Sequence, residues 1–281
     1  MKKIVIITFL LFSIVAPLYA GGGWTQKKGK GFIKLNQWWV RSSKYYNRES
    51  NIIDITTTGV YVSSLYMEYG ITDRFTAIAY TPFFVRSTLN KREDASGNQL
   101  SDGDQLNGFG DLDLAIKYGL LQNKKIVLSV GLQVGIPSGN PSGGNSKLLQ
   151  TGDGEFNQML TLDASHSFYP IPLYVSTQVA LNNRTNNFSD EFRYGIETGY
   201  TIKQLTVIIR LNGVKSFFNG DDSAVSGNGI FNNNVEFIAY SGELIYAPNE
   251  KFGISVGAAS ALQGRQILAN RTYNAGVFIK I

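Results

Sequence analysis

The stretch 109–136 alternates apolar side chains with small or polar ones over two segments that flank a short polar turn. Leu114 and Ile116 in the first segment, and Leu128 and Val130 in the second, share one parity. Successive residues of a strand point to opposite faces of a sheet. The pattern therefore predicts a β-hairpin with one apolar and one polar face. The apolar face could contact a second sheet or, in a transmembrane barrel, lipid.

The same period-two pattern recurs along the chain in twelve segments of about ten residues, the length that a tilted strand needs to cross a bilayer. These segments are 31–41, 57–69, 75–86, 109–121, 125–136, 155–168, 173–183, 191–200, 205–215, 234–246, 252–262 and 271–281. Short turns at 70–74, 122–124, 169–172, 201–204 and 247–251 alternate with longer polar loops at 42–56, 87–108, 137–154, 184–190, 216–233 and 263–270. This alternation is typical of bacterial outer-membrane barrels, and a soluble sandwich gives no reason for it.

Aromatic residues support the same interpretation. Each of the five short turns is entered through an aromatic at the lipid-facing parity of its strand: Tyr69, Tyr118, Phe168, Tyr200 and Tyr246. Aromatic side chains settle at the membrane–water interface, where barrels carry them as a girdle. The alternative is that each is a core residue. We therefore expect an all-β fold, a membrane-spanning antiparallel up-and-down β-barrel of about twelve strands, formed by one domain over 21–281.

The first twenty residues predict export. Lys2 and Lys3 precede an apolar run over 4–15 and a small-residue segment that ends at Ala20, as in a secretory signal peptide. The alternative, a membrane anchor, is disfavoured because the apolar run is too short to span a bilayer. We expect a signal peptide over 1–20 with cleavage near Ala20, and location in the outer membrane of a Gram-negative bacterium. The expected partners are outer-membrane lipid, lipopolysaccharide and the barrel-assembly machinery, which reads a terminal strand such as 271–281.

Composition excludes several classes of function. The chain has 26 Lys and Arg, two of them in the predicted signal peptide, against 21 Asp and Glu, so the exported part is only weakly basic. No basic stripe stands out, and we expect no nucleic-acid partner. Cysteine is absent, which excludes disulfides and thiolate metal sites. We expect neither a metal nor a cofactor.

Charged and polar residues occupy the inward parity of the predicted strands. The candidates for the lining of the lumen, the space inside the barrel, are Lys34, Arg86, Asp111, Asp113, Lys117, Gln133, Asp163, Gln178, Arg193, Glu197, Arg210, Glu243 and Lys280. Unpaired charges in a dry interior are costly, so these groups must pair or contact water. They either brace the wall as an ion-pair lattice or form a polar pore lining that selects solutes, and both roles are compatible. The leader 21–30 is too short to form a plug domain.

The lone histidine, His166, has Ser165 and Ser167 as neighbours. This arrangement is similar to outer-membrane phospholipases, whose twelve-stranded barrels carry a Ser-His-Asn site on the lipid face. Here His166 is predicted near the short-turn rim, and Ser167 points to the other side of the sheet. We therefore expect no catalytic residues and no enzyme, with a lipid hydrolase as the least favoured alternative.

Three stretches together resemble a known family. They are 69–75 leading to 81–83, then 108–118, then 131–139. The set resembles the outer-membrane proteins named after the meta-pathway of phenol degradation, relatives of the fatty-acid and aromatic-hydrocarbon channels. The resemblance implies a passive channel for small solutes, hydrophobic or aromatic compounds among them, without catalytic residues. The alternative is a structural or surface-interaction barrel with a closed lumen.

Overall fold

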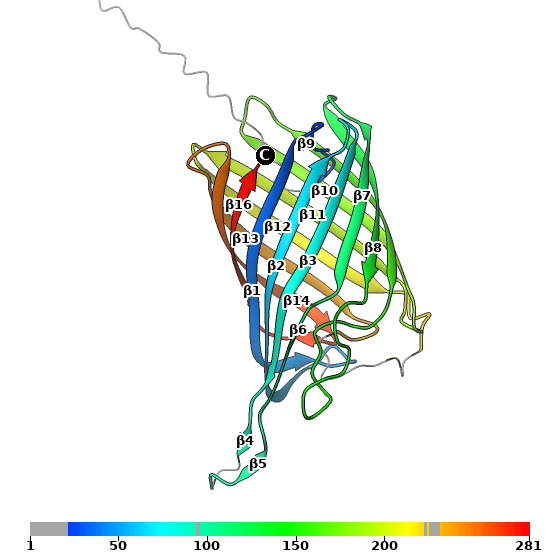
Figure 1. The fold of residues 1–281 in the computed structure, drawn as a ribbon, viewed down its shortest axis with the longest axis vertical. Helices are drawn as coiled ribbons and strands as arrows, with labels where there is room; N and C mark the ends of the chain where they lie inside the picture. The colour runs from blue at the N-terminus through cyan, green and yellow to red at the C-terminus, as the bar shows by residue number, and fades with distance from the viewer. Residues whose placement is uncertain (1–21, 94–95, 222–223, 225–230) are drawn as a thin grey trace, which may run out of the picture.

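The chain forms a closed barrel of twelve long antiparallel strands (Figure 1). The computed structural model describes residues 22–93, 96–221, 224 and 231–281, so the predicted signal peptide lies outside the described residues. The barrel strands are β1 (Gly31–Tyr46), β2 (Ile52–Gly70), β3 (Phe75–Leu89), β7 (Leu112–Leu121), β8 (Ile126–Ile136), β9 (Asn157–Ser167), β10 (Leu173–Arg184), β11 (Glu191–Ile202), β12 (Leu205–Ser216), β13 (Glu236–Tyr246), β14 (Phe252–Arg265) and β16 (Thr272–Lys280). The short strands are β4 (Arg92–Glu93), β5 (Gln99–Ser101), β6 (Asp104–Gly108) and β15 (Ile267–Leu268).

The ring closes between the first and last strands. β1 pairs with β2 on one side and with β16 on the other, and Ile33 lies between Met67 and Ile279 in this register. The remaining barrel strands pair with their neighbours in chain order. Closure satisfies the backbone groups that an open sheet edge would leave unpaired, which is a requirement inside a bilayer.

The outer face of the barrel is apolar and exposed. Leu132 is 52% exposed, Ile209 58% and Val256 52%, and each alternates with an inward residue along its strand. Tyr69, Phe168, Tyr200 and Tyr246 all have exposed side chains at the short-turn end, as the sequence pattern predicted. At the long-loop end Trp39 stacks on Tyr273 of the neighbouring strand. No helix in the described ranges is long and apolar enough to cross a membrane.

The region 87–108 was predicted to be a loop, and this prediction is wrong. It contains β4 and β5, whose hairpin projects beyond the barrel at the long-loop end (Figure 1), and β6, which pairs with the end of β3. The strand predicted over 109–121 begins only at Leu112, because β3 passes from β7 to β6 at this point.

The prediction that Arg86 faces the lumen is also wrong. A β-bulge opposite Ser64 places one extra residue in β3, and Pro82, which has no N–H to donate, lies within it. The extra residue inverts the parity of the strand beyond it. Val85 and Ser87 are therefore buried on the inner side, whereas Arg86 is exposed on the outer side and donates to Gln105 at 2.9 Å.

Candidate functional site

The lumen is the candidate site, because the other predicted lining residues lie at its wall. Lys34, Lys117, Asp163, Arg210 and Glu243 share the inner parity with buried residues of their strands. Asp113, Gln133, Gln178, Arg193 and Glu197 lie on the same side, with Asp111 at the long-loop end and Lys280 at the short-turn end. The inner wall also carries two apolar clusters, one around Phe32 and Phe278 and one around Val60 and Val85.

A chain of alternating charges runs around the wall from β1 to β11. Lys34 donates to Glu243 at 2.7 Å, and Arg210 donates to the second oxygen of Glu243 at 2.8 Å. Arg210 also pairs with Glu197, which accepts a 2.6 Å hydrogen bond from the Tyr174 hydroxyl. These side chains are 8% to 24% exposed, so the charges compensate one another while still contacting the lumen.

Lys34 of β1 reaches Glu243 of β13 across β16 and β14, because Gly276 of β16 has no side chain in the way. A Cβ at Gly276 of β16 would lie 2.8 Å from the Lys34 Cε. The aliphatic part of the Lys34 side chain therefore packs on Gly276, in the space that a side chain at that position would occupy. Tyr174 lies in the same way over Gly199, whose Cβ would lie 2.2 Å from its ring. Such packing of a long side chain over glycine is known in β-sheets.

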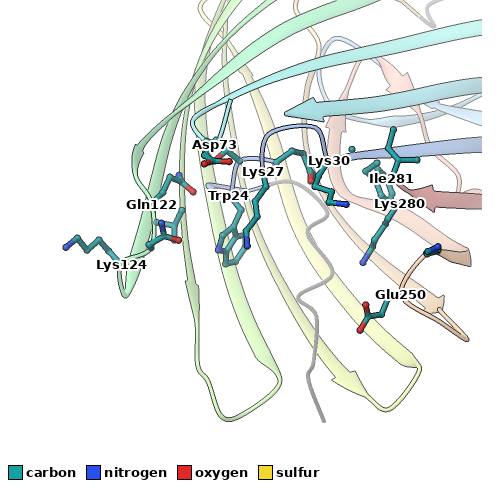
Figure 2. A pocket seen from close by; sticks show the side chains of 16 residues that line it. Trp24, Lys27, Lys30, Asp73, Gln122, Lys124, Glu250, Lys280 and Ile281 are labelled. Carbon is teal, nitrogen blue, oxygen red and sulfur yellow. The ribbon is translucent and has the colours of Figure 1, made fainter. Parts of the chain in front are cut away.

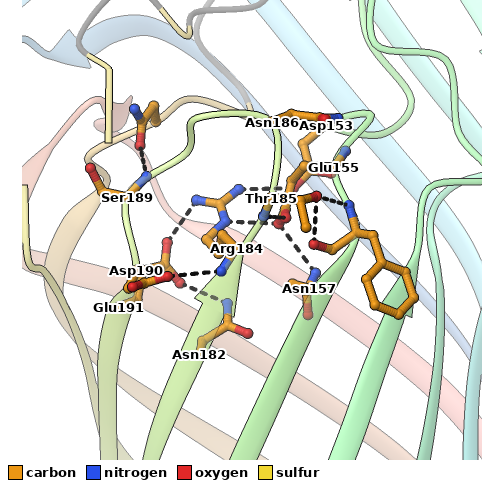
Figure 3. Close-up of polar contacts among 12 residues, drawn as sticks. Asp153, Glu155, Asn157, Asn182, Arg184, Thr185, Asn186, Ser189, Asp190 and Glu191 are labelled. Atoms are coloured by element: carbon orange, nitrogen blue, oxygen red, sulfur yellow. Dashed lines mark hydrogen bonds and ion pairs between the residues drawn. The ribbon is translucent and has the colours of Figure 1, made fainter. Parts of the chain in front are cut away.

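A second charge cluster lies at the long-loop end, around Arg184 at the end of β10 (Figure 3). Its guanidinium donates to Glu155 at 2.8 Å, Glu191 at 2.9 Å and Asp153 at 3.0 Å. The Arg184 side chain is 5% exposed, and Glu155 and Glu191 are 1% and 4% exposed. Arg184 also lies over the ring of Phe188. The planar fork of arginine presents its donors in fixed directions, so that one guanidinium binds three carboxylates at once.

The loop 137–154 is held by the carboxylates of Asp111 and Asp104 as well as by the Arg184 cluster. Asp104 accepts hydrogen bonds from the backbone N–H groups of Asn145 at 3.1 Å and Ser146 at 2.8 Å. Asp111 accepts hydrogen bonds from the backbone N–H groups of Gly139 and Asp153, both at 2.8 Å. Leu149 and Gln150 within the loop are fully buried. Burial, together with the nearby charge of Asp153, raises the pKa of Asp111 to about 6 although the two backbone donors lower it. Burial also raises the pKa of Glu155.

The wall formed by β7, β8 and β9 carries mainly acidic groups. Asp163 is 1% exposed and accepts from the amide of Gln178 at 2.7 Å. Asp113 hydrogen-bonds Gln133. Lys117 is the basic residue of this wall, and it donates at 2.7 Å to the carbonyl of Gly22 rather than to a carboxylate.

That contact belongs to a feature that sequence reasoning missed. Residues 22–30, here called the strap, run inside the barrel along the short-turn end before they enter β1. The N–H of Gly23 donates to Ser165 of β9, and the N–H of Gln26 donates to Thr76 of β3, both at 2.8 Å. The Gln26 amide donates to Glu68 of β2 at 2.7 Å.

The strap fits closely against the inner wall at its first residues. A Cβ on Gly23 would lie 2.7 Å from the Val127 carbonyl oxygen, so a larger residue has no room there. Trp24 makes an edge-to-face contact with Tyr174, with 5.7 Å between ring centroids. The strap is short, and it lies inside the barrel at the short-turn end. The run of small residues at 21–23 directly before Trp24 is the only signal for it in the sequence.

Neither of the serines adjacent to His166 lies on its face of the sheet. Ser165 is 3% exposed on the inner side and Ser167 shares its parity, whereas His166 pairs with Ile126 on the outer face. The His166 ring contacts Phe168 and the Lys125 carbonyl. No group of three or more His, Cys, Asp or Glu residues is arranged to hold a metal ion in the part of the chain that the structure describes.

Comparison with solved structures places the fold among outer-membrane barrels. An outer-membrane channel from Pseudomonas putida is 13% identical to this chain, and the TM-score is 0.61. The alignment covers 93% of this chain and 99% of the channel. The NanC porin is 10% identical, with 89% and 100% covered and a TM-score of 0.52. The β domain of a Bordetella autotransporter is 12% identical, with 91% and 100% covered and a TM-score of 0.50. Neither a protein-family model nor a curated protein matches the chain. The class defined here is therefore the outer-membrane β-barrel, at the level of fold.

Proposed function

We propose that the protein is a passive channel of a bacterial outer membrane through which small solutes diffuse down their gradients. The observation that carries the proposal is a cavity of about 1230 Å³ inside the short-turn end of the barrel (Figure 2). Further along the inner wall, the side chains of Lys34, Glu243, Arg210 and Glu197 are 8% to 24% exposed. A lumen with this lining can contact water and hydrated solutes.

The membrane assignment rests on the outer surface. Exposed apolar side chains encircle the barrel between two aromatic rims, as expected where acyl chains replace water. We propose outer-membrane lipid and lipopolysaccharide as its surroundings, the barrel-assembly machinery as its insertion partner, and removal of residues 1–20 on export. Two of the similar solved structures are described as a channel and a porin, which supports transport rather than catalysis.

The resemblance of three sequence stretches to the phenol meta-pathway proteins extends the proposal to hydrophobic or aromatic solutes. Aromatic rings on the inner wall offer contacts to such molecules, because a flat apolar body stacks on them. Trp24 and Tyr174 lie near the short-turn end, and Trp38 packs against the buried cluster around Val60.

Single-channel conductance in planar bilayers, together with swelling of liposomes in arabinose, tests transport. Gln178→Trp places a large ring at an exposed position on the inner wall of β10, and Val179→Trp places it on the outer face one residue away. We expect the parent to conduct, Gln178→Trp to lower the unitary conductance, and Val179→Trp to match the parent. A folded parent that neither conducts nor admits arabinose would contradict the proposal, as would equal effects of the two variants.

The second candidate is a structural or surface-interaction barrel with a closed lumen. The inner apolar clusters favour it, because Val60 is fully buried and Phe278 is 3% exposed although both lie on the inner side. Such a barrel would bind a partner through its long loops and would show no unitary conductance. The conductance measurement therefore separates the two candidates.

A further inference from the structure

The cavity at the short-turn end, here called the vestibule, is lined by the strap, by turns between strands and by β16. The strap supplies one side, with Trp24, Lys27 and Lys30 (Figure 2). The turn after β7 supplies Lys124, the turn after β13 supplies Glu250 and Lys251, and β16 supplies Lys280. Segments that are far apart in the sequence thus place lysines around one concave space, although the Lys124 side chain extends away from it in Figure 2.

Positive charge is in excess on these walls. Five lysines line the vestibule: Lys27, Lys30, Lys124, Lys251 and Lys280. Asp73 and Glu250 are the lining carboxylates, and the count remains five to three if the α-carboxylate of Ile281 is included. Asp73 already accepts a 2.9 Å hydrogen bond from the backbone N–H of Lys28. The vestibule therefore carries more cationic groups than its own acids can compensate.

The contrast with the rest of the lumen is direct. Lys34, Arg184, Arg193 and Arg210 each form an ion pair with a carboxylate. None of the five vestibule lysines has a carboxylate within 4.0 Å in the described ranges. Four inner cations elsewhere in the barrel are thus paired with carboxylates and Lys117 donates to a carbonyl oxygen, whereas the vestibule lysines form no close ion pair, although Glu250 interacts electrostatically with Lys280.

We propose that the vestibule is a binding site for small anions, with organic carboxylates and phosphates as the chemical class. Several like charges around a low-dielectric concavity focus the field and raise the local concentration of counter-ions. Lysine ammonium groups are mobile point charges with three donors each, so they adapt to carboxylate and phosphate oxygens alike. Trp24 adds an apolar surface for the body of an organic anion. Passage of the anion rests on the proposed channel function, whereas its binding does not.

Quenching of Trp24 fluorescence measures the field of the vestibule without any need for conduction. Trp38→Phe and Trp39→Phe leave Trp24 as the single tryptophan, since the chain has 3. In this background we compare Lys27→Gln/Lys30→Gln/Lys251→Gln with Lys28→Gln/Lys125→Gln/Lys203→Gln. The second set removes the same charge from exposed lysines near the same rim that do not line the vestibule.

We expect iodide to quench Trp24 more strongly than caesium, relative to neutral acrylamide. The vestibule variant should lose about threefold of the iodide preference at 0.15 M salt and more at lower salt, from Coulomb's law with screening. The control variant should retain it. Citrate, as a polyvalent probe, should compete with iodide in the parent and in the control. Equal iodide quenching in the two variants, or no competition by citrate, would overturn the proposal.

Reversal potentials in a KCl gradient then connect binding to transport. We expect chloride preference in the parent, a decrease of about threefold in the vestibule variant, and no change in the control. A parent that shows the iodide and citrate effects but never conducts refutes the channel and leaves the anion site standing. A parent that conducts with equal ion preference in both variants refutes the anion site and leaves the channel standing.

Discussion

Replacing Arg184 by Gln removes the cation that Asp153, Glu155 and Glu191 share at the long-loop end. The lost contacts are three charged hydrogen bonds of 2.8 to 3.0 Å to side chains that are 1% to 17% exposed. Removing one partner of a buried charge network typically costs about 3–5 kcal/mol, because the remaining charges stay buried without compensation. We expect this cost to appear first as opening of the loop 137–154, since Asp153 and Glu155 connect that loop to β10.

Limited trypsinolysis measures this opening, because Lys147 lies exposed in the loop. Cleavage follows the population of the open loop when opening and closing are fast. A cost of about 3 kcal/mol raises that population more than about a hundredfold. The cut at Lys147 is identified by mass spectrometry, and retention of the barrel is checked by the heat-dependent shift in gel mobility.

Arg193→Gln is the matched control in the same cluster. Its side chain is 41% exposed, and its side-chain hydrogen bonds among the described residues go to Glu191, so we expect a loss below about 1 kcal/mol. An Arg184→Gln protein that is cut at Lys147 within about fivefold of the parent rate, or no faster than Arg193→Gln, would refute the reasoning.

Two further predictions concern charges of the lumen and of its mouth. Glu243→Gln leaves Lys34 and Arg210 without their shared carboxylate, and we expect the free energy of unfolding, measured in urea with the protein in micelles, to fall by about 2–3 kcal/mol. The control is Glu236→Gln, whose partner Lys215 is 62% exposed, and it should lower the free energy of unfolding by less than about 1 kcal/mol. Equal losses in the two variants would contradict the argument. The pKa of Asp111, about 6 in the folded protein and above its ordinary value, means that its stabilising contribution is complete below about pH 4 and is lost as the pH rises through 6. After a discount for its partial exposure we expect the parent to lose about 1–2 kcal/mol more than Asp111→Asn between pH 4.5 and 7.5, and parallel pH profiles of the two proteins would rule this out.

The features that sequence reasoning predicted are those governed by alternation. Apolar positions along β7, β8 and β12 face outward as the period of two requires, and all five short turns carry their aromatic. The inner charges followed from the same parity. Their pairing could not be predicted, because Lys34 meets Glu243 only through a register that brings strands distant in the sequence together.

The features that the sequence analysis predicted wrongly or did not find have identifiable physical causes. Pairing with a partner strand, and not composition, creates β6 and the bulge at Pro82 that turns Arg86 outward. The strap has no period of its own, because its polar contacts go to several strands, among them β9, β3 and β2. The Arg184 cluster joins the end of β10 to residues on both sides of it in the chain, and no local spacing marks such a set.

Glycines of the inner wall act as sockets, that is, positions where a neighbouring side chain occupies the space of the missing Cβ, and they affect the width of the lumen. A methyl group at Gly276 would meet the Lys34 stem at 2.8 Å, and one at Gly131 would meet the Thr161 hydroxyl at 2.5 Å. Gly242, which faces lipid between Ser241 and Glu243, has no atom within 4 Å of such a methyl group. Replacing such a glycine by a larger residue therefore displaces the side chain that packs on it toward the barrel axis. The width of the lumen and the position of the charges then change together. The width of the lumen depends as much on the side chains that the wall lacks as on those that it carries.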